Sequence, residues 1–367
     1  SVAGTLTVSG GGTLDVVGAS VTGVAVTAGG TLNLTGGTVN VGPQDNSFCN
    51  RRFNVVSGGT LSVSTGNLNV AGSLVIGSGG TITQSGGTIR VDGNAANVSA
   101  NSVAAGNIVD FTIAAQANLN LTGGTLLIVD PHTLTGSTNR AFGNQTGANV
   151  TCGVGHTFQF GDGISTDATA NTGGFVQETY IGSTRILYGN LVINSGSSGN
   201  RALVTQDFTW QFVGVEGNMT ITSGDYRNTG TLTVAGNLVN NGTLTSTGTL
   251  AMSSSSGTGT FATATTASTI SGSGTFQNAA ASPTAQLVGF RIQNSNVAGV
   301  TMSLPLSMSG TLTMAEGKLT TTATNLLTMT ATTSSVATGT ATAGYVSGPI
   351  RRTVPASTTN ASYFFPV

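Results

Sequence analysis

A short phrase of alternating polar and aliphatic residues recurs along most of the chain, each time directly after a glycine. Near the N-terminus it reads Gly4-Thr5-Leu6-Thr7-Val8. Successive side chains of a β-strand emerge on opposite faces, so this alternation predicts a short strand with one buried face. We therefore expect the two aliphatic side chains of each phrase to point inward and the two threonines to face water.

The clearest register has a glycine at every sixth residue. These glycines are Gly230, Gly236, Gly242 and Gly248, and each is followed two residues later by a leucine, namely Leu232, Leu238, Leu244 and Leu250. A strand of this length leaves no room for a helix before the next glycine, so the chain must bend sharply there. Glycine tolerates the positive φ that such bends need. We predict that the four leucines point into one continuous core.

In the first third of the chain the repeat closes after three steps. The distances between Gly59, Gly66, Gly72 and Gly80 are seven, six and eight residues, which together make 21. Repeats of this length indicate a solenoid in which each rung stacks its aliphatic residues on those of the next. The predicted fold class is all-β, a parallel β-helix (β-solenoid) with short glycine-cornered strands and loop insertions. A β-sandwich array is the competing architecture, but its strands usually recur every 8 to 12 residues or so.

Interruptions of the pattern divide the chain into four expected segments. Residues 1-130 and 216-330 carry regular β-solenoid rungs, whereas 131-215 reads as irregular, insertion-rich rungs or a flap. Residues 331-367 form a C-terminal β segment that docks or begins a further domain. The only tryptophan, Trp210, falls in the irregular segment, where core packing is the ordinary interpretation and a surface binding platform the alternative.

Charge is unusually scarce. Only 6% of the residues are charged and the net charge is −1, against roughly a quarter charged in ordinary soluble domains. Hydrophobic types still reach 38%, which a disordered chain lacks, so a packed fold is expected. Nucleic-acid binding needs clustered lysine and arginine, and only the pairs Arg51-Arg52 and Arg351-Arg352 come close, so we expect no nucleic-acid partner. No stretch is apolar enough to predict a membrane span.

The C-terminal part carries two longer motifs. They are Gly344-Tyr345-Val346-Ser347-Gly348-Pro349-Ile350-Arg351-Arg352 and Tyr363-Phe364-Phe365-Pro366-Val367. Their order resembles a segment that recurs in large secreted and cell-surface proteins of the Bacteroidota, and the preceding Gly-Thr-Leu repeats are similar to adhesin solenoids. The resemblance implies an extracellular location at the cell surface. In such relatives the Phe-Pro-Val segment leads into further β structure, so either this chain is part of a longer protein or its terminal strand completes the fold against another subunit.

These observations together predict an extracellular structural protein, the subunit of a surface fibre or filament or an adhesin stalk, which acts by self-association and is not an enzyme. The expected partner is another copy of the chain, with surface glycans as a second possibility, and no cofactor is expected. An unpaired strand edge at residues 1 to 8 would template such assembly. The self-association candidates are Tyr363, Phe364, Phe365, Pro366 and Val367, because this segment is too hydrophobic for a free tail.

The main rival function is that of a polysaccharide-binding or polysaccharide-cleaving β-helix. Such sites need carboxylates close together as acid and base or as calcium ligands, and the chain has no adjacent pair of acids. The local candidate for Ca²⁺ is a loop with Asp162 and Asp167, near His156 and Glu178, for which a solvated turn is the plain alternative. No catalytic or cofactor-binding residue is assigned.

A minor alternative is an ice-binding solenoid. Outward threonine pairs such as Thr5 and Thr7, or Thr81 and Thr83, resemble the flat arrays that form the binding face of some ice-binding solenoids. The ordinary explanation is that β-branched residues favour strands.

The two cysteines, Cys49 and Cys152, are a disulfide candidate. They lack metal-ligand spacing, so no metal site is assigned to them. Direct stacking of rungs cannot join them, but both fall in irregular insertions that could fold toward each other, and an oxidising extracellular setting favours pairing. Buried free thiols and an intermolecular bridge are the alternatives, and mass spectrometry without reduction distinguishes the three.

Overall fold

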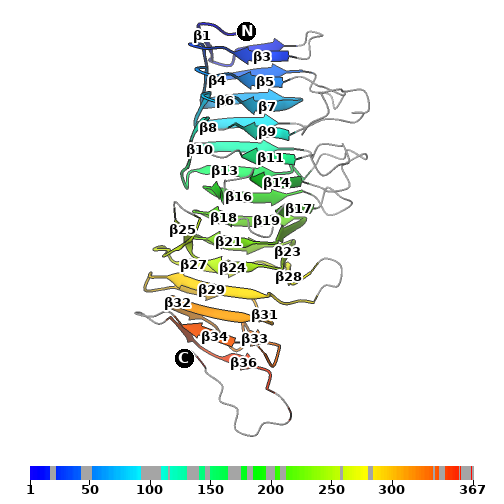
Figure 1. Ribbon diagram of the computed structural model, residues 1–367, viewed down its shortest axis with the longest axis vertical. Helices are drawn as coiled ribbons and strands as arrows, with labels where there is room; N and C mark the ends of the chain where they lie inside the picture. Colours follow the sequence, from blue (N-terminus) through cyan, green and yellow to red (C-terminus); the bar gives the residue numbers. More distant parts are fainter. Residues whose placement is uncertain are drawn as a thin grey trace. The chain divides into compact units, whose positions relative to one another are not determined.

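The computed structural model describes residues 1–16, 22–42, 52–91, 109–114, 116–129, 140–144, 149–163, 175–179, 185–195, 203–206, 212–256, 259–279, 284–333, 335–338, 344–354, 356 and 365. Within these ranges every regular element is a β-strand, and every described pairing is parallel apart from that of β25 (Ser254–Ser255) with β26 (Phe261–Ala262). The chain divides into two compact units, Ser1–Asp207 and Phe208–Val367. Within each unit the strands stack in chain order (Figure 1). The predicted parallel β-helix is confirmed.

The first unit contains the strands β1 to β17. They are β1 (Thr5–Ser9), β2 (Thr13–Val16), β3 (Thr22–Val26), β4 (Thr31–Val41), β5 (Arg52–Val55), β6 (Thr60–Val70), β7 (Ser73–Ile76), β8 (Thr81–Val91), β9 (Val109–Ile113), β10 (Asn118–Ile128), β11 (Arg140–Asn144), β12 (Asn149–Cys152), β13 (His156–Phe160), β14 (Phe175–Thr179), β15 (Arg185–Tyr188), β16 (Asn190–Asn194) and β17 (Leu203–Gln206).

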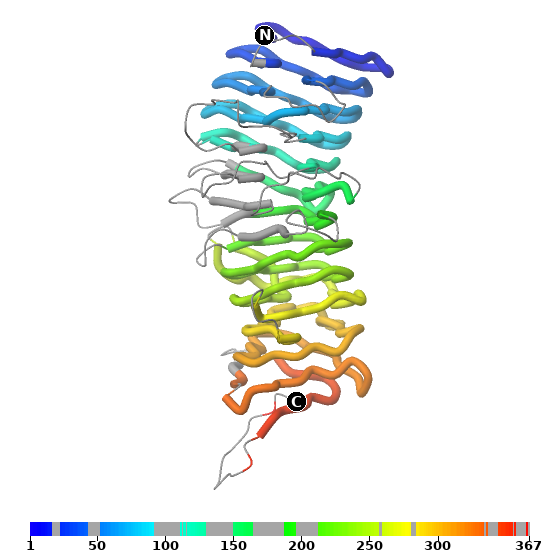
Figure 2. The backbone as a smooth tube through the Cα atoms, turned by 90° about the vertical axis from the view of Figure 1, so that its right-hand side faces the viewer, coloured from blue at the N-terminus to red at the C-terminus, as the bar shows by residue number. Residues whose placement is uncertain are grey.

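Three faces of stacked strands surround the core of this unit, and Figure 2 shows its rungs stacked one on the next. The first face is formed by β3, β5, β7, β9, β11, β14 and β17. The second face consists of β1, the first halves of β4, β6, β8 and β10, and β12. The third face consists of β2, the second halves of the same long strands, β13 and β16. Thr60 pairs with Thr81, which confirms the predicted turn of 21 residues.

The long strands turn a corner at a glycine. In β6 buried and half-buried residues alternate, and the alternation breaks between Ser64 and Asn67 before it resumes. Gly66 lies at this break with a φ of +84°. A Cβ there would lie 2.2 Å from the carbonyl oxygen of Gly37 in the rung before. Two of the predicted short strands are therefore joined into one, bent where only glycine lets successive backbones approach.

A second corner is a stack of tight turns before the long strands. In each turn a backbone N–H donates back across three residues, as from Gly59 to Val56 at 2.9 Å. The third position has a positive φ, +74° at both Gly58 and Gly79, and Gln116 takes that position with a φ of +61°. The turns also bond to one another, because the Gly58 N–H donates to the Gly79 carbonyl at 3.0 Å. The hydrogen bonds that join successive strands within each face are therefore continued by hydrogen bonds between successive turns at this corner.

The second unit contains the strands β18 to β36. They are β18 (Phe212–Val215), β19 (Met219–Ser223), β20 (Asp225–Asn228), β21 (Thr231–Val234), β22 (Leu238–Asn240), β23 (Thr243–Ser246), β24 (Thr249–Met252), β25 and β26 as given above, β27 (Ser268–Ser271), β28 (Thr275–Gln277), β29 (Gly289–Asn294), β30 (Val300–Met302), β31 (Leu306–Met308), β32 (Thr311–Thr320), β33 (Leu327–Met329), β34 (Ser335–Thr338), β35 (Tyr345–Ser347) and β36 (Ile350–Arg352).

The hexad leucines of this unit all face the core, as predicted. Leu232 pairs with Leu250 in one face, while Leu238 and Leu244 belong to two other faces. All four are fully buried. One turn of the coil here takes 18 residues, the separation between the paired Asn228 and Ser246.

The described parts of the irregular segment 131-215 include strands that stack with the rest of the coil. His156–Phe160 forms β13, which stacks between β10 and β16. Phe158 and Phe160 are buried, and the ring of Phe158 lies 5.0 Å from those of Phe160 and Tyr188. Aromatic residues fill wider rungs here, so this part of the segment consists of rungs. Phe53 of β5, outside this segment, is also a fully buried aromatic residue of the core.

We predict that Gly66→Ala destabilises the first unit more than Gly58→Ala does. Both substitutions place a side chain at positive φ, which costs roughly 1–2 kcal/mol. The new Cβ at position 66 also meets a backbone oxygen at 2.2 Å, whereas at position 58 its nearest neighbour is 3.6 Å away. Urea unfolding monitored by circular dichroism measures the difference. An equal loss of unfolding free energy in the two variants would show that the close approach of the Gly37 carbonyl to position 66 is not what requires glycine there.

Candidate functional site

The structure gathers no metal site from the residues it describes. Asp162 lies two residues after the end of β13 and is half-buried, while Asp167 lies outside the described residues. No three His, Cys, Asp or Glu side chains come together in the described part of the chain. The Ca²⁺ site at Asp162 and Asp167 therefore stays a prediction.

Cys152 ends β12, and its thiol has no disulfide partner among the described residues. Burial raises the pKa of this thiol to about 12, although a hydrogen bond with the Gly189 backbone opposes the shift. A thiol that remains protonated at neutral pH is a poor nucleophile for disulfide exchange. Cys49 lies outside the described residues, so the pairing of the two cysteines stays a prediction.

A buried polar pair crosses the interior of the first unit. His156 Nε2 lies 3.2 Å from Gln84 Oε1, and both side chains are fully buried. The Gln84 amide nitrogen donates to the carbonyl oxygens of Thr125 at 3.0 Å and Gly87 at 3.4 Å. These two bonds fix the amide orientation, so Gln84 Oε1 must accept and His156 Nε2 must carry the proton.

The remaining ring nitrogen, His156 Nδ1, is buried and has no hydrogen-bond partner in the structure. A protonated imidazole would need a second acceptor there. Burial lowers the pKa of His156 to about 4, because the charged form loses its hydration. The histidine is therefore neutral at pH 7 and serves to orient Gln84 across the corner of β8.

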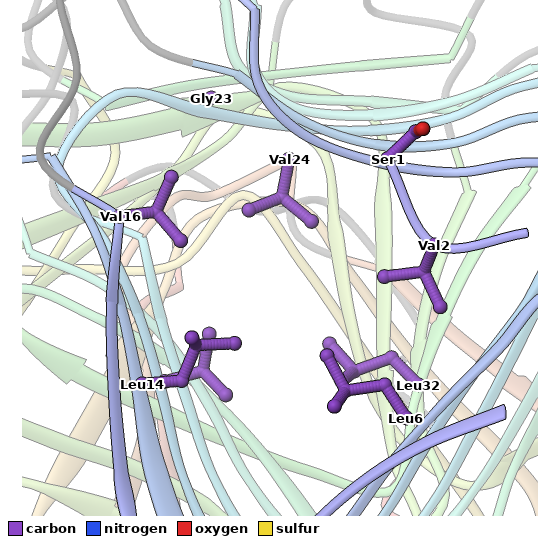
Figure 3. Close-up of a pocket in the computed structure, with 9 residues that line it drawn as sticks. Ser1, Val2, Leu6, Leu14, Val16, Gly23, Val24 and Leu32 are labelled. Carbon is purple, nitrogen blue, oxygen red and sulfur yellow. The ribbon is translucent and has the colours of Figure 1, made fainter.

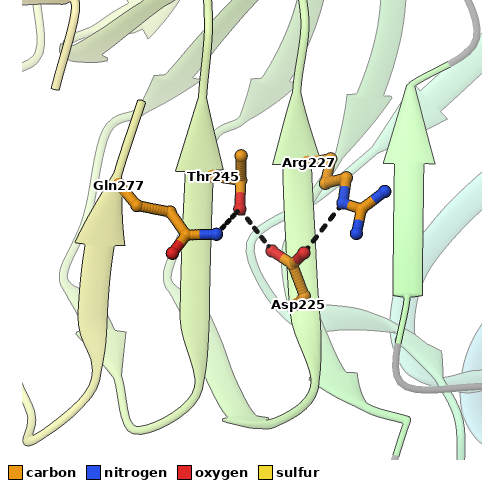
Figure 4. A network of polar contacts seen from close by, with 4 residues as sticks. All are labelled: Asp225, Arg227, Thr245 and Gln277. Atoms are coloured by element: carbon orange, nitrogen blue, oxygen red, sulfur yellow. Dashed lines mark hydrogen bonds and ion pairs between the residues drawn. The ribbon is translucent and has the colours of Figure 1, made fainter. Parts of the chain in front are cut away.

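The second unit carries an outward polar network across three adjacent strands (Figure 4). Asp225 accepts the Thr245 hydroxyl at 2.7 Å on Oδ1 and Arg227 Nε at 2.8 Å on Oδ2. The Gln277 amide then donates to the Thr245 hydroxyl at 2.8 Å. Both carboxylate oxygens are engaged, which suits a group that aligns rungs. The side chains of Asp225 and Arg227 are 18% and 36% exposed, and an ion pair near the surface contributes little to stability on its own.

The β25–β26 hairpin covers one outer face of the second unit. β25 contacts β18 and β21, and the Phe261 ring of β26 packs against Phe212 at 5.8 Å and under the Arg291 guanidinium at 4.3 Å. Glu216 accepts the Ser255 backbone N–H at 2.9 Å and the Ser254 hydroxyl. The hairpin is thus held by aromatic packing at one strand and by a carboxylate at the other.

The first unit has an open end beside β1 and β2 (Figure 3). There the side chains of Val2, Leu6, Leu14, Val16 and Val24 surround a cavity of about 190 Å³. In the interior of the unit the equivalent aliphatic positions are fully buried, whereas Leu6 is 37% exposed. Core positions of the first rung are therefore left uncovered.

The C-terminal self-association candidates fall largely beyond the described residues. Phe365 is described and is 42% exposed, whereas Tyr363, Phe364, Pro366 and Val367 are not. Trp210 is likewise outside the described part. The docking of this segment stays a prediction.

Compared with known protein families, with curated proteins and with solved structures, the chain matches none of them. Among the residues described, no helix has the length and apolarity required to cross a bilayer.

The sequence did not predict the Gln84–His156 contact or the outer hairpin. The two residues of the contact are 72 positions apart, and nothing in a local pattern relates them. One signal was present for Gln84: it takes the inward position of β8 that Val63 takes in β6. A polar residue at an inward position calls for a buried partner.

We predict that the first unit loses stability as the pH falls from about 6.5 to 4, and that His156→Gln reduces the loss. The unfolded chain binds a proton at His156 in this range, near pKa 6.5, while the folded chain does not. The stabilisation is complete above pH 6.5 and is lost as the pH approaches the folded value of about 4. This difference between the unfolded and folded pKa of His156 corresponds to a change in the free energy of unfolding on the order of 3 kcal/mol. Urea midpoints at pH 7 and pH 4.5 measure it.

Thr157→Gln is the matched control, since Thr157 is the outward neighbour of His156 on β13 and has no group that titrates in this range. This variant should keep the wild-type pH dependence. If the urea midpoint fell equally with pH in the wild type and in His156→Gln, the acid sensitivity would come from a group other than His156.

Proposed function

We propose that this chain is an extracellular structural protein that builds a surface fibre, filament or adhesin stalk by stacking of solenoid units. The observation that supports this most directly is the open end of the first unit. In the described structure β1 pairs with β4 on one side only, and so does β2. Their other edges present unpaired backbone N–H and C=O groups, which are a template for a further strand.

The strands of the open edge carry few of the features with which sheets resist such pairing. Natural edge strands carry lysine, proline or a bulge that blocks another chain. β1 reads Thr-Leu-Thr-Val-Ser, and β2 has Asp15 as its single charge. The edge therefore favours addition of another rung.

The interior of the open end specifies what kind of surface can cover it. The next rung covers one side of the first rung, where Leu32, Val39 and Val41 stack on Leu6, Leu14 and Val16. The other side of these three side chains has no rung against it among the described residues. A rung with aliphatic residues at every second position would bury these side chains, at about 25 cal/mol per Å² of apolar surface. The chain itself supplies such rungs throughout, so a second copy in parallel orientation is the partner that fits.

A mechanical role outside the cell agrees with the chemistry of the chain. Its surface is built from hydroxyl and amide side chains with few charges, and its C-terminal motifs resemble those of Bacteroidota surface proteins. A stack of parallel strands resists separation through many hydrogen bonds acting together.

We predict that the purified chain forms concentration-dependent oligomers that grow end to end, and that Leu6→Asp with Leu14→Asp weakens them. A carboxylate on each side chain would be buried without a partner on stacking. Light scattering after size exclusion and negative-stain electron microscopy measure oligomer size and shape. Deletion of residues 361 to 367 in the same assay tests the C-terminal segment as a second joining element.

Val154→Asp is the control, because Val154 is an exposed apolar residue of the same unit, 62% exposed and away from the open end. It should assemble like the wild type. A wild type that stays monomeric at all concentrations, or an equal loss in the control, would contradict assembly through this end.

A further inference from the structure

The second face of the first unit carries outward side chains of one chemical kind. They form two columns that run across β1, β4, β6, β8, β10 and β12 in unbroken register. The first column is Thr5, Thr31, Thr60, Thr81 and Asn118, and the second is Thr7, Asn33, Ser62, Thr83, Asn120 and Thr151. All are threonine, asparagine or serine, and none is charged.

These side chains are open to solvent, and every one of them is half-buried or exposed. Apart from Asn118, none has a hydrogen-bond, ionic or ring partner among the described residues. The hydroxyl and amide groups of these residues other than Asn118 are therefore available to a ligand.

One column of the neighbouring third face differs in both respects. Its outward Asn40 donates to Asp15 at 2.7 Å, and Asn69 donates to Asn40 at 2.8 Å. Arg90 follows in the same column. The other column of the third face is again uncharged and consists of Thr13, Thr38, Asn67, Thr88 and Thr125. Of these two faces, only the second therefore has uncharged side chains in both columns.

Sheet geometry fixes the spacing of the array. Neighbouring strands lie about 4.8 Å apart, and residues two apart on one strand lie about 6.7 Å apart. Threonine is stiff at χ1, so its methyl and hydroxyl are held in place before any ligand arrives. Binding then orders few side-chain rotors, which lowers the entropic cost of association.

We propose that this face binds the surface of an ice crystal. A ligand that matches it must be periodic, uncharged, and both donor and acceptor of hydrogen bonds at each repeat, and ordered water in ice meets all three conditions. A polyanion would need cations, and the two columns contain none. The columns also lack the aromatic residues that commonly line binding sites for organic ligands, which disfavours a glycan chain as the occupant.

The test compares two substitutions on one strand, Thr81→Tyr and Arg90→Tyr. Both residues are outward and half-buried on β8, Thr81 in the array and Arg90 in the charged column of the third face. Tyrosine is a good strand former, so both variants should fold, which circular dichroism and thermal melting verify. A ring at position 81 interrupts the array in the middle of its first column.

The readouts are incorporation of the labelled chain into slowly growing ice and the thermal hysteresis of its solution. The wild type and Arg90→Tyr should enter the ice and shape the crystals, whereas Thr81→Tyr should lose most of both activities. Exclusion of the wild type from ice, or equal activity of the two variants, would overturn the proposal. So would a wild type that sediments with crystalline cellulose or chitin while it is excluded from ice, since that result assigns the face to a glycan. None of these outcomes depends on whether the chain stacks end to end.

Discussion

Each rung is held to the next by backbone hydrogen bonds between parallel strands in register, and these bonds require successive backbones to stay close even where the chain bends. Strands can lie about 4.8 Å apart along a straight face without difficulty. At a corner the carbonyl of one rung points at the Cα of the next, and a Cβ on Gly87 or Gly124 would lie 2.5 Å from such an oxygen. Glycine at the corners is thus the condition on which the stacking of the faces depends.

Once the rungs stack, the alternation of side chains along each strand decides which residues form the core and which form the surface. Inward positions form continuous columns of aliphatic residues, such as Leu32, Leu61 and Ile82, all fully buried. Outward positions form columns as well, and their chemistry differs from face to face. The second face of the first unit leaves its hydroxyls unengaged, whereas the Asp225 network of the second unit engages its own. One repetitive backbone can therefore carry several distinct surfaces.

Departures from the repeat are accommodated because each rung contacts only its neighbours. Gln84 replaces an aliphatic residue at an inward position, and the structure satisfies its amide with His156 and two backbone carbonyls. The chain segment after β24 leaves the coil to form the β25–β26 hairpin, and β29 then resumes pairing with β24. Extra residues lengthen the path between rungs without changing the ladder.

The sequence by itself determined the strand alternation, the corners and the buried leucines, because a period of two and a glycine at a bend are local properties of the chain. It also predicted the turn of 21 residues where no insertion intervenes. It did not determine which outward threonines align. Thr60 and Thr81 are one turn apart, but Thr81 pairs next with Asn118 across a much longer connection. The free energy of closing a loop changes slowly with its length, so connections of very different lengths give the same stacking. For that reason the columns of the second face and the contact between Gln84 and His156 were decided by the tertiary structure.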